Sequence, residues 1–203
     1  MAKAVRFYEA GGPEVLRYED VEVGDPGPGQ VRLRHVAVGL NFADTYFRSG
    51  IYPIPLPNGM GVEASGVVQA VGDGVTNVTM GDRVTYTGFL NTLGAYSTER
   101  LISAAPLIKL PESIGFETAA AMTMRGLTSA YLMRRIVALK AGDTILLHAA
   151  AGGVGLIVSQ WAKLLGITVI GTVSTEEKAA IARAHGCAHT INYSHEDVAK
   201  RVR

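Results

Sequence analysis

The sequence predicts a β-rich domain with barrel character, followed by the first half of a doubly wound parallel α/β sheet. All eight prolines lie within residues 1–111, among short stretches in which apolar and polar residues alternate. After Pro111 the apolar stretches become longer, and strand-like and helix-like segments follow one another. Alternation with a period of two is typical of half-buried strands, and the later strand–helix order is typical of a parallel sheet. We expect two domains, residues 1–124 and 125–203.

In the first domain, four segments have the pattern of strands bounded by turns. They are residues 30–39, 64–75 (which ends in a Gly-Asp-Gly turn), 81–87 and 95–103. Residues 53–59 contain three prolines, which lack the backbone N–H that a central strand or a helix interior needs, so we expect a loop there. Many short strands with tight turns favour a barrel.

In the second part of the chain, helices and strands alternate. We expect helices at 116–136, 152–166 and 174–186, and strands at 144–150, 167–173 and 189–193. The first helix should be interrupted near Gly126, and the second should end at Gly166, a residue typical of helix C-termini. Ser174 or Thr175 should cap the third. Three parallel strands with two crossover helices form half of a doubly wound sheet.

Composition excludes several classes of protein. The net charge is +1, from 19 basic and 18 acidic residues, and no basic stripe is present, which argues against binding of DNA or RNA. The single cysteine, Cys187, cannot form an intrachain disulfide or a thiolate zinc cluster, and a reducing cytoplasm is the expected location. The N-terminus has no secretory signal, and no apolar run approaches the roughly 18 residues of a membrane span.

The segment HAAAGGVG, residues 148–155, lies between the first predicted parallel strand and its helix. Its spacing is Ala149-x-x-Gly152-x-x-Gly155, in which alanine replaces the first glycine of the dinucleotide fingerprint. Gly152 and Gly153 should let backbone N–H groups approach phosphate oxygens, and Gly155 should let the helix pack close to the sheet. The segment therefore predicts a pyrophosphate site.

The next loop favours NADPH over NADH. NAD-binding units usually place an acid about 20 residues after the glycines, where it binds the ribose 2′-hydroxyl. Here that position reads GTVST (171–175), and the first acid is Glu176. Ser174 and Lys178, one helical turn later, can bind a 2′-phosphate that an acid would repel, and Tyr193 can donate a further hydrogen bond.

Motifs over almost the whole chain also carry a family resemblance. They are GGPEVL (11–16), VGLNFADTYFRSGIYP (38–53), GVEASGVVQAVGDGV (61–75), GDRV (81–84), GAYSTE (94–99), RGLTSAYL (125–132), HAAAGGVG (148–155) and INYSHEDV (191–198). The chain resembles quinone oxidoreductases of the zeta-crystallin type, in the zinc-free branch of the medium-chain dehydrogenase/reductase superfamily. The resemblance implies a GroES-like β-domain followed by a Rossmann domain, NADPH-dependent reduction of a quinone, and a homodimer in the full-length protein.

The resemblance also implies roles for individual residues. Asn41, Phe42, Asp44 and Tyr46 match the nicotinamide side of the cofactor site, as does Thr128. The remaining cofactor-binding residues that it implies are Gly152, Gly153, Val154, Thr172, Ser174, Lys178 and Tyr193. Tyr52 matches an aromatic of the substrate pocket, and Asn41, Tyr46 and Tyr52 are the expected catalytic residues.

We expect no metal. Zinc-dependent relatives carry histidine and cysteine ligands around the GVE segment, whereas here Val62 precedes Glu63 and no cysteine is near. The five histidines, His35, His148, His185, His189 and His195, lack metal-ligand spacing. Reduction of a quinone makes the ring aromatic, so it does not need the Lewis acid that stabilises an alkoxide in alcohol dehydrogenases.

Two alternatives stay open at this point. One is an NADPH-dependent reductase of enones or enoyl thioesters, in which Tyr46 or Tyr52 would donate a proton. The other is a non-catalytic NADPH-binding or structural protein, as lens crystallins of this type suggest. The family's chains are longer than this one, which stops at Arg203, so we also expect a truncated form that lacks the second half of the Rossmann sheet.

Overall fold

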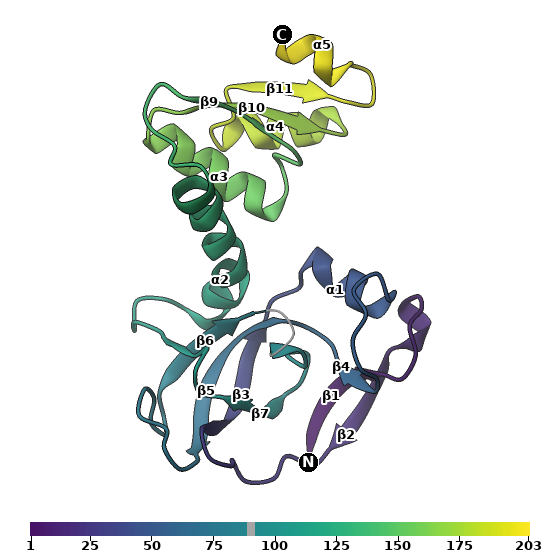
Figure 1. The fold of residues 1–203 in the computed structure, drawn as a ribbon, viewed down its shortest axis with the longest axis vertical. Coiled ribbons are helices and arrows are strands. Elements are labelled where there is room, and N and C mark those ends of the chain that lie inside the picture. Colours follow the sequence, from purple (N-terminus) through teal and green to yellow (C-terminus); the bar gives the residue numbers. More distant parts are fainter. Residues whose placement is uncertain (89–91) are drawn as a thin grey trace. The chain divides into compact units, whose positions relative to one another are not determined.

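The computed structural model describes residues 1–88 and 92–203, and it divides into two compact units, Met1–Met124 and Arg125–Arg203. Figure 1 labels the elements of both units. The boundary between the units falls inside one helix, α2 (Phe116–Tyr131). None of the helices in the described part of the chain is long and apolar enough to cross a membrane.

The first unit consists of two antiparallel sheets that curve around a core (Figure 1). The larger sheet has the order β7-β3-β5-β6-β8 and the smaller one the order β2-β1-β4. A bridge between Ala4 and Ser97 joins the smaller sheet to the segment before β7, and Val5 N donates a 2.7 Å hydrogen bond to Tyr96 O. The strands are β1 (Ala2–Phe7), β2 (Arg17–Val21), β3 (Gln30–Val38), β4 (Asn58–Gly59), β5 (Glu63–Val71), β6 (Arg83–Thr87), β7 (Glu99–Ser103) and β8 (Ile108–Lys109), with a 3-10 turn at Pro13–Val15 and the helix α1 (Phe42–Arg48).

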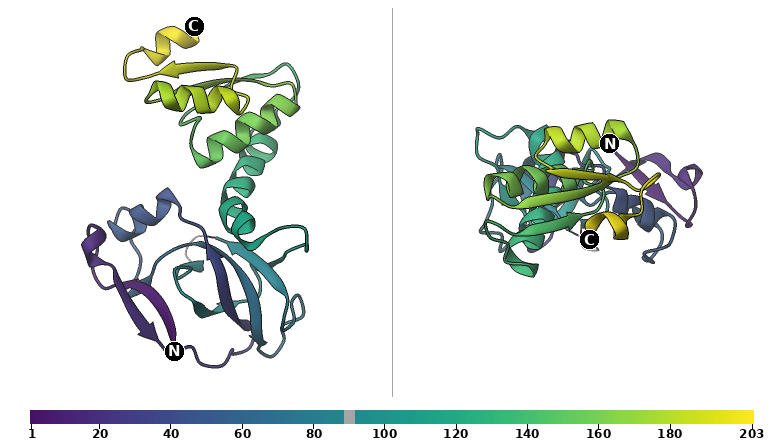
Figure 2. Two further views of the ribbon diagram at one scale, coloured as in Figure 1. Left: turned by 180° about the vertical axis from the view of Figure 1, so that it is seen from behind. Right: turned by 90° about the horizontal axis from the view of Figure 1, so that it is seen from above.

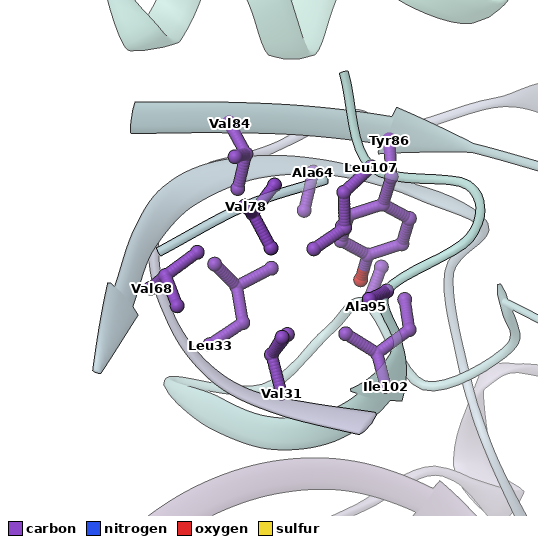
Figure 3. Close-up of a cluster of buried hydrophobic side chains, with 11 residues drawn as sticks. Val31, Leu33, Ala64, Val68, Val78, Val84, Tyr86, Ala95, Ile102 and Leu107 are labelled. Carbon is purple, nitrogen blue, oxygen red and sulfur yellow. The ribbon is translucent and has the colours of Figure 1, made fainter. Parts of the chain in front are cut away.

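The alternation in these strands determines what they bury. Val31 and Leu33 of β3 are fully buried, whereas Arg32 between them points outward and forms an ion pair with Glu99 at 3.1 Å. Figure 3 shows these valine and leucine side chains converging on side chains from β5, β6 and β7. Burial of each such side chain stabilises the fold by roughly 1.5–3 kcal/mol relative to exposure. The core of the first unit therefore follows from the period-two pattern.

Most of the strands predicted for the first unit are present, with shifted ends. The strand predicted at 95–103 begins only at Glu99, because Tyr96 and Ser97 form the bridging contacts to β1 instead. The proline-rich segment 53–59 is a loop up to Pro57, and its last two residues pair with β1 at the edge of the smaller sheet as β4. An edge position is where a segment preceded by proline is tolerated.

The second unit has a three-stranded parallel sheet with the order β11-β10-β9. Its elements are the end of α2, a π-helical turn at Leu132–Ile136, β9 (Thr144–Leu147), α3 (Gly153–Leu164), β10 (Thr168–Val173), α4 (Glu176–Ala184), β11 (His189–Asn192) and α5 (Val198–Val202). Within this unit, α3 and α4 cover one face of the sheet, and α5 lies on the other side (Figure 2). This is the strand–helix–strand–helix–strand unit that the sequence predicts.

Helix ends in this unit have clear chemical causes, and one prediction was wrong. Gly126 does not interrupt α2, which runs on to Tyr131 before the π-helical turn. A helical glycine costs about 1 kcal/mol relative to alanine, which neighbouring helix formers can tolerate. Gly166 follows the end of α3 with a φ of 70°, which suits a residue without Cβ. Of the two candidate caps for α4 it is Thr175 whose hydroxyl accepts the N–H of Lys178, at 3.3 Å.

Candidate cofactor site

The turn between β9 and α3 places the N-terminus of α3, a twelve-residue helix, next to the carboxyl end of β9. Gly152 is the N-cap, with extended backbone (φ −83°, ψ 173°), and α3 begins at Gly153. The first N–H groups of an α-helix have no partner inside the helix, and the helix dipole adds partial positive charge at this end. A phosphate is the group that such an end binds best. The turn therefore has the chemistry of the predicted pyrophosphate site.

Ala149, at the first position of the fingerprint, has a φ of 53°, in the left-handed region that glycine usually occupies. Two backbone hydrogen bonds hold the turn in this shape. Gly152 N donates to Ala149 O at 2.8 Å, and Ala150 N donates to Thr172 O at 3.1 Å. The second bond ties the turn to the end of β10. The replacement of glycine by alanine thus leaves the turn intact but strained.

The remaining glycines of the turn are close to other atoms of the same unit. A Cβ on Gly155 would lie 2.5 Å from Ala149 O and 2.7 Å from atoms of Ala150, so Gly155 lets α3 approach the backbone of the turn rather than the strands of the sheet. A Cβ on Gly153 would lie 2.5 Å from both Cδ and Nε of Arg125. Arg125, which the sequence analysis did not single out, therefore lies against the first residue of α3.

Beside this turn is a cavity of about 150 Å³. Its lining consists of Ala149, Ala151, Gly152, Thr172, Val173, Ser174, Lys178 and Tyr193. Lys178 Nζ donates a 2.9 Å hydrogen bond to Ser174 Oγ, so the ammonium group and the hydroxyl meet at the cavity. Tyr193 is about half exposed. Among the described residues that line the cavity none is acidic. The cavity thus offers the ammonium group of Lys178 and the hydroxyls of Ser174 and Tyr193. Such groups, without a carboxylate beside them, favour the binding of an anion.

Five of the residues predicted to bind the cofactor line this one cavity, namely Gly152, Thr172, Ser174, Lys178 and Tyr193. Thr172 is buried, and its hydroxyl lies 3.0 Å from Nδ1 of His148. Val154, in the first turn of α3, packs its side chain on the core of the second unit. Thr128 lies on α2, half-buried, and is not among the residues that line the cavity.

The other predicted site residues lie in the first unit, on and beside α1. Asn41 precedes the helix, and its backbone N–H donates to Asp44 Oδ2 at 2.9 Å. The side-chain Nδ2 of Asn41 donates to Glu63 Oε2 at 2.9 Å, and the other Glu63 oxygen accepts the N–H of Met124 at 2.5 Å. The hydroxyl of Tyr96 donates to Asp44 Oδ2 at 2.7 Å. A buried hydrogen-bond network therefore fixes the orientation of Asn41.

The environment of this network shifts two ionisation equilibria. Asp44 is 3% exposed, and its Oδ1 is buried with no hydrogen-bond partner among the described residues. Burial raises the pKa of Asp44, although the hydrogen bonds from Tyr96 and from Asn41 N oppose the shift. Burial and the adjacent Asp44 carboxylate raise the pKa of Tyr96 well above its ordinary value. Tyr96 thus stays protonated and acts as a hydrogen-bond donor.

Aromatic rings cover the outer side of α1. Phe42 and Tyr46 meet edge to face with their centroids 5.4 Å apart, and Tyr46 meets Tyr52 in the same way at 5.3 Å. Phe47 lies beneath, 5.6 Å from Tyr52. Phe42 is 74% exposed and Tyr52 is 40% exposed. Such exposed rings offer a surface on which an aromatic ligand can stack.

Sequence reasoning missed two members of the network, Tyr96 and Met124, and considered Glu63 only in connection with zinc. The sequence held one signal for Glu63, because it is the single charged residue in the apolar stretch GVEASGVV. In the structure it is fully buried. Buried charges are paired as a rule, so a lone acid in an apolar strand indicates partners elsewhere in the fold. Nothing in the local sequence marks Tyr96 as such a partner.

Comparisons with known proteins agree with this geometry. Residues 27–112 match the family model described as alcohol dehydrogenase GroES-like domain, and residues 153–203 match the one described as zinc-binding dehydrogenase. The first unit, with its β-rich fold, and the second, with its dinucleotide-type turn, have the two-domain organisation of the dehydrogenase/reductase class. The chain belongs to the medium-chain dehydrogenase/reductase family.

Within that family the chain is similar to quinone oxidoreductases and to a 2-haloacrylate reductase. The chain is 55% identical over 203 residues to quinone oxidoreductase from Pseudomonas aeruginosa, covering 100% of this chain and 62% of that protein. It is 51% identical over 210 residues to a 2-haloacrylate reductase from a Burkholderia species, again covering 100% and 62%. The chain thus spans about 62% of the length of these relatives.

Solved structures show the same fold. Quinone oxidoreductase of Pseudomonas syringae pv. Tomato DC3000 matches with a TM-score of 0.96 and 56% identity, covering 100% of this chain and 62% of that one. Quinone oxidoreductase of Escherichia coli, solved in complex with NADPH, matches with a TM-score of 0.95 and 46% identity, covering 98% and 61%. The predicted fold class, a GroES-like β-domain followed by part of a Rossmann domain, is confirmed.

One of the two family names mentions zinc, a metal that needs His, Cys, Asp or Glu ligands. No group of three or more His, Cys, Asp or Glu side chains that could hold a metal ion occurs within residues 1–88 and 92–203. Val62 is buried and apolar, and both oxygens of the adjacent Glu63 carboxylate accept hydrogen bonds. Zinc sites in proteins use three or four such ligands. The donor set of the described residues does not fit zinc.

Proposed function

We propose that this chain binds NADPH and takes part in the metal-free reduction of a quinone. The cavity formed by Ser174, Lys178 and Tyr193, beside the N-terminus of α3, is the observation that carries the proposal. NADPH supplies the hydride for such a reduction when it is bound. The support from known proteins is the similarity to quinone oxidoreductases, one of them solved with NADPH.

The cavity suits the 2′-phosphate that distinguishes NADPH from NADH. The Lys178 ammonium group offers a charge-assisted hydrogen bond, and Ser174 Oγ lies 2.9 Å from it. The cavity adjoins the turn at Gly152, where the N–H groups of α3 suit the pyrophosphate. Both phosphate-binding features of the proposal therefore follow the carboxyl ends of neighbouring parallel strands, β9 and β10, where open α/β sheets bind their ligands.

In the first unit we propose that Asn41, Tyr46 and Tyr52 act on the reacting rings. The amide of Asn41 is held by Glu63 and therefore has a fixed orientation. The edge-to-face pairs of Tyr46 with Phe42 and Tyr52 present a rigid aromatic surface on which a quinone or nicotinamide ring can stack. Hydride transfer to a quinone needs positioning above all, because the product ring is aromatic. Asp44 supports Asn41 by accepting its backbone N–H.

The direct test is titration of the chain with NADPH and with NADH, followed by NADPH oxidation assays with a panel of benzoquinones and naphthoquinones. Tighter binding of NADPH than of NADH, with turnover of a quinone, is the expected result. Equal binding of the two cofactors would contradict the assignment of the cavity. Binding of NADPH without turnover of any acceptor would favour the non-catalytic alternative instead.

A second candidate is reduction of an activated carbon–carbon double bond. The observation that favours it is the 51% identity to a 2-haloacrylate reductase, which is close to the identity to the quinone oxidoreductase. A tyrosine of the aromatic cluster, Tyr46 or Tyr52, is available as proton donor for the carbon next to the acceptor group. Side-by-side rates with 1,4-benzoquinone, 2-chloroacrylate and an enoyl thioester distinguish the two functions.

We further propose that the activity requires no zinc. The support is the donor set around Glu63, where Val62 occupies the preceding position and the carboxylate is already hydrogen-bonded. Activity should survive EDTA and 1,10-phenanthroline. A rate that falls with chelator and returns with added zinc would contradict this proposal.

A cytoplasmic location and a homodimer complete the proposal. The location is supported by Cys187, a buried free thiol whose pKa burial raises and which suits a reducing compartment. The homodimer is supported only by the resemblance to the quinone oxidoreductase family. Fractionation of the host cell tests the first, and sedimentation equilibrium across a range of protein concentrations tests the second.

A further inference from the structure

The first acid after the neutral loop, Glu176, lies two residues from Ser174, yet it does not line the cavity. Its Oε1 accepts a 3.0 Å hydrogen bond from Nδ2 of Asn192, at the end of β11. Glu176 is the first residue of α4 and is exposed. Among the side-chain hydrogen bonds within residues 1–88 and 92–203, only this one fixes the direction of its carboxylate. An exposed glutamate without such a contact samples several rotamers.

Asn192 is itself firmly held. It is 5% exposed, its Oδ1 accepts the N–H of Ser194 at 3.2 Å, and its backbone N–H donates to Glu196 at 2.8 Å. The hydroxyl of Ser194 donates in turn to the carbonyl of Ser174 at 2.8 Å. Asn192 therefore connects the loop after β11 with the start of α4, and the segments on both sides of this contact contribute lining residues to the cavity, namely Tyr193 and, after β10, Ser174 and Lys178.

We infer that Asn192 is a positioning residue for cofactor choice: it holds the Glu176 carboxylate out of the cavity, so that the 2′-phosphate meets Lys178 and Ser174 without a competing negative charge. The inference rests on the proposed function, since it assumes that the cavity binds the 2′-phosphate of NADPH. A released Glu176 would be a mobile negative charge two residues from both Ser174 and Lys178, the groups proposed to bind that phosphate, and like charges repel. The same carboxylate would not repel NADH, because the ribose 2′-hydroxyl of NADH can donate a hydrogen bond to a carboxylate.

The test measures dissociation constants for NADPH and NADH in wild type, Asn192→Ala, Glu176→Gln and the double variant, at 0.15 M salt. Asn192→Ala should weaken NADPH binding about fivefold, because it releases a charge near the phosphate, and should leave NADH binding unchanged or slightly tighter. Glu176→Gln alone should change either constant less than about twofold, because surface charges already held away are screened. In the double variant, NADPH binding should return to within about twofold of wild type, because the released charge is absent.

A purely structural role for Asn192 gives a different pattern. Loss of folding or of the loop would weaken NADPH and NADH together, and Glu176→Gln would not restore binding. Thr190→Ala is the matched control, since Thr190 lies on the same strand and accepts a hydrogen bond from Arg183 of α4 at 2.6 Å, but does not line the cavity. It should leave both constants unchanged.

Each result decides between the inference and its alternatives. Unchanged NADPH binding in Asn192→Ala, lack of rescue in the double variant, or an equal loss in Thr190→Ala would overturn the inference. Its failure is separate from failure of the proposed function. If wild type itself binds NADPH no more tightly than NADH, the assignment of the cavity is wrong, whereas a wild-type preference that survives Asn192→Ala contradicts only the role of Asn192.

Discussion

The hydroxyl of Tyr96 donates a 2.7 Å hydrogen bond to Oδ2 of Asp44, joining the segment before β7 to the first turn of α1. This bond partly offsets the free-energy cost of burying the Asp44 carboxylate, which is 3% exposed. The second oxygen of that carboxylate is buried without a hydrogen-bond partner among the described residues. Asp44 accepts the N–H of Asn41 on the same Oδ2. Tyr96 thus supports Asp44, which holds the backbone of Asn41, whereas Glu63 holds the side-chain amide of Asn41.

Tyr96→Phe should therefore destabilise the fold by about 1–3 kcal/mol at pH 7, because a buried carboxylate loses a hydrogen bond. The loss should shrink at lower pH. Burial raises the pKa of Asp44, the bond from Tyr96 opposes that shift, and a protonated Asp44 needs the donor less. Urea unfolding at pH 7 and pH 5 measures both effects. Tyr18→Phe, at a tyrosine that is 68% exposed, should change the unfolding free energy little, and an equal loss there would contradict the argument.

Lys178→Met should weaken NADPH binding about tenfold, which corresponds to about 1.4 kcal/mol, and should leave NADH binding nearly unchanged. The reason is loss of the ammonium group that lies 2.9 Å from Ser174 Oγ at the cavity. Isothermal titration calorimetry with both cofactors provides the measurement. Lys140→Met, which removes an exposed lysine of the same unit, is the control. Equal losses for the two cofactors would show that Lys178 does not bind the 2′-phosphate.

His35 should make the stability of the chain fall as the pH drops from about 6.5 to about 4. Its Nδ1 lies 2.7 Å from Ser97 O and its Nε2 lies 3.1 Å from the buried Tyr86 hydroxyl. Burial, together with the nearby charge of Arg100, lowers the pKa of His35 to about 4. In this pH range the imidazole of His35 binds a proton in the unfolded chain but not in the folded chain. The contribution of His35 to the free energy of unfolding is therefore fully present above pH 6.5. The loss amounts to about 3 kcal/mol at pH 4 and levels off below that pH.

Chemical denaturation of wild type and His35→Gln between pH 4 and pH 7.5 tests this dependence. Glutamine can donate and accept as the neutral imidazole does, but it does not titrate. The difference between the two pH profiles isolates the contribution of His35 to stability from that of Asp44. Asp44 acts in the opposite direction, because its raised pKa gives a contribution that is present at low pH and lost as the pH rises. Parallel profiles for the two proteins would mean that His35 does not titrate differently in the folded state.

The sequence predicts features that depend on neighbours along the chain and misses those that depend on distant ones. The strand–turn–helix at Gly152 and the neutral loop at Ser174 are local patterns, and both lie where they were expected. The Asp44 network joins residues that are 22, 52 and 61 positions apart, so no periodicity or spacing reveals it. The prediction that Gly126 interrupts the helix was wrong because it relied on one residue alone. The helix propensity of glycine, about 1 kcal/mol less favourable than that of alanine, is too small to end a long helix.

Ala149→Gly should stabilise the chain although it removes a side chain. Ala149 has a φ of 53°, and a residue with Cβ in the left-handed region costs roughly 1–2 kcal/mol. Glycine relieves that cost, but it also gains about 0.4–1 kcal/mol of conformational entropy in the unfolded chain. Because Ala149 is exposed, no buried methyl group is lost. The net gain should be between about 0 and 1.6 kcal/mol, measured as a higher denaturation midpoint with an unchanged slope.

Ala180→Gly is the matched control for this substitution, because it makes the same chemical change at an exposed position in the interior of α4. There the backbone is helical, so glycine should destabilise by roughly 0.5–1 kcal/mol. The two variants should thus shift the midpoint in opposite directions. A loss of stability in Ala149→Gly as large as that in Ala180→Gly would mean that the turn does not strain Ala149. NADPH affinity should be retained in Ala149→Gly, because glycine is the usual residue at this position of a dinucleotide fingerprint.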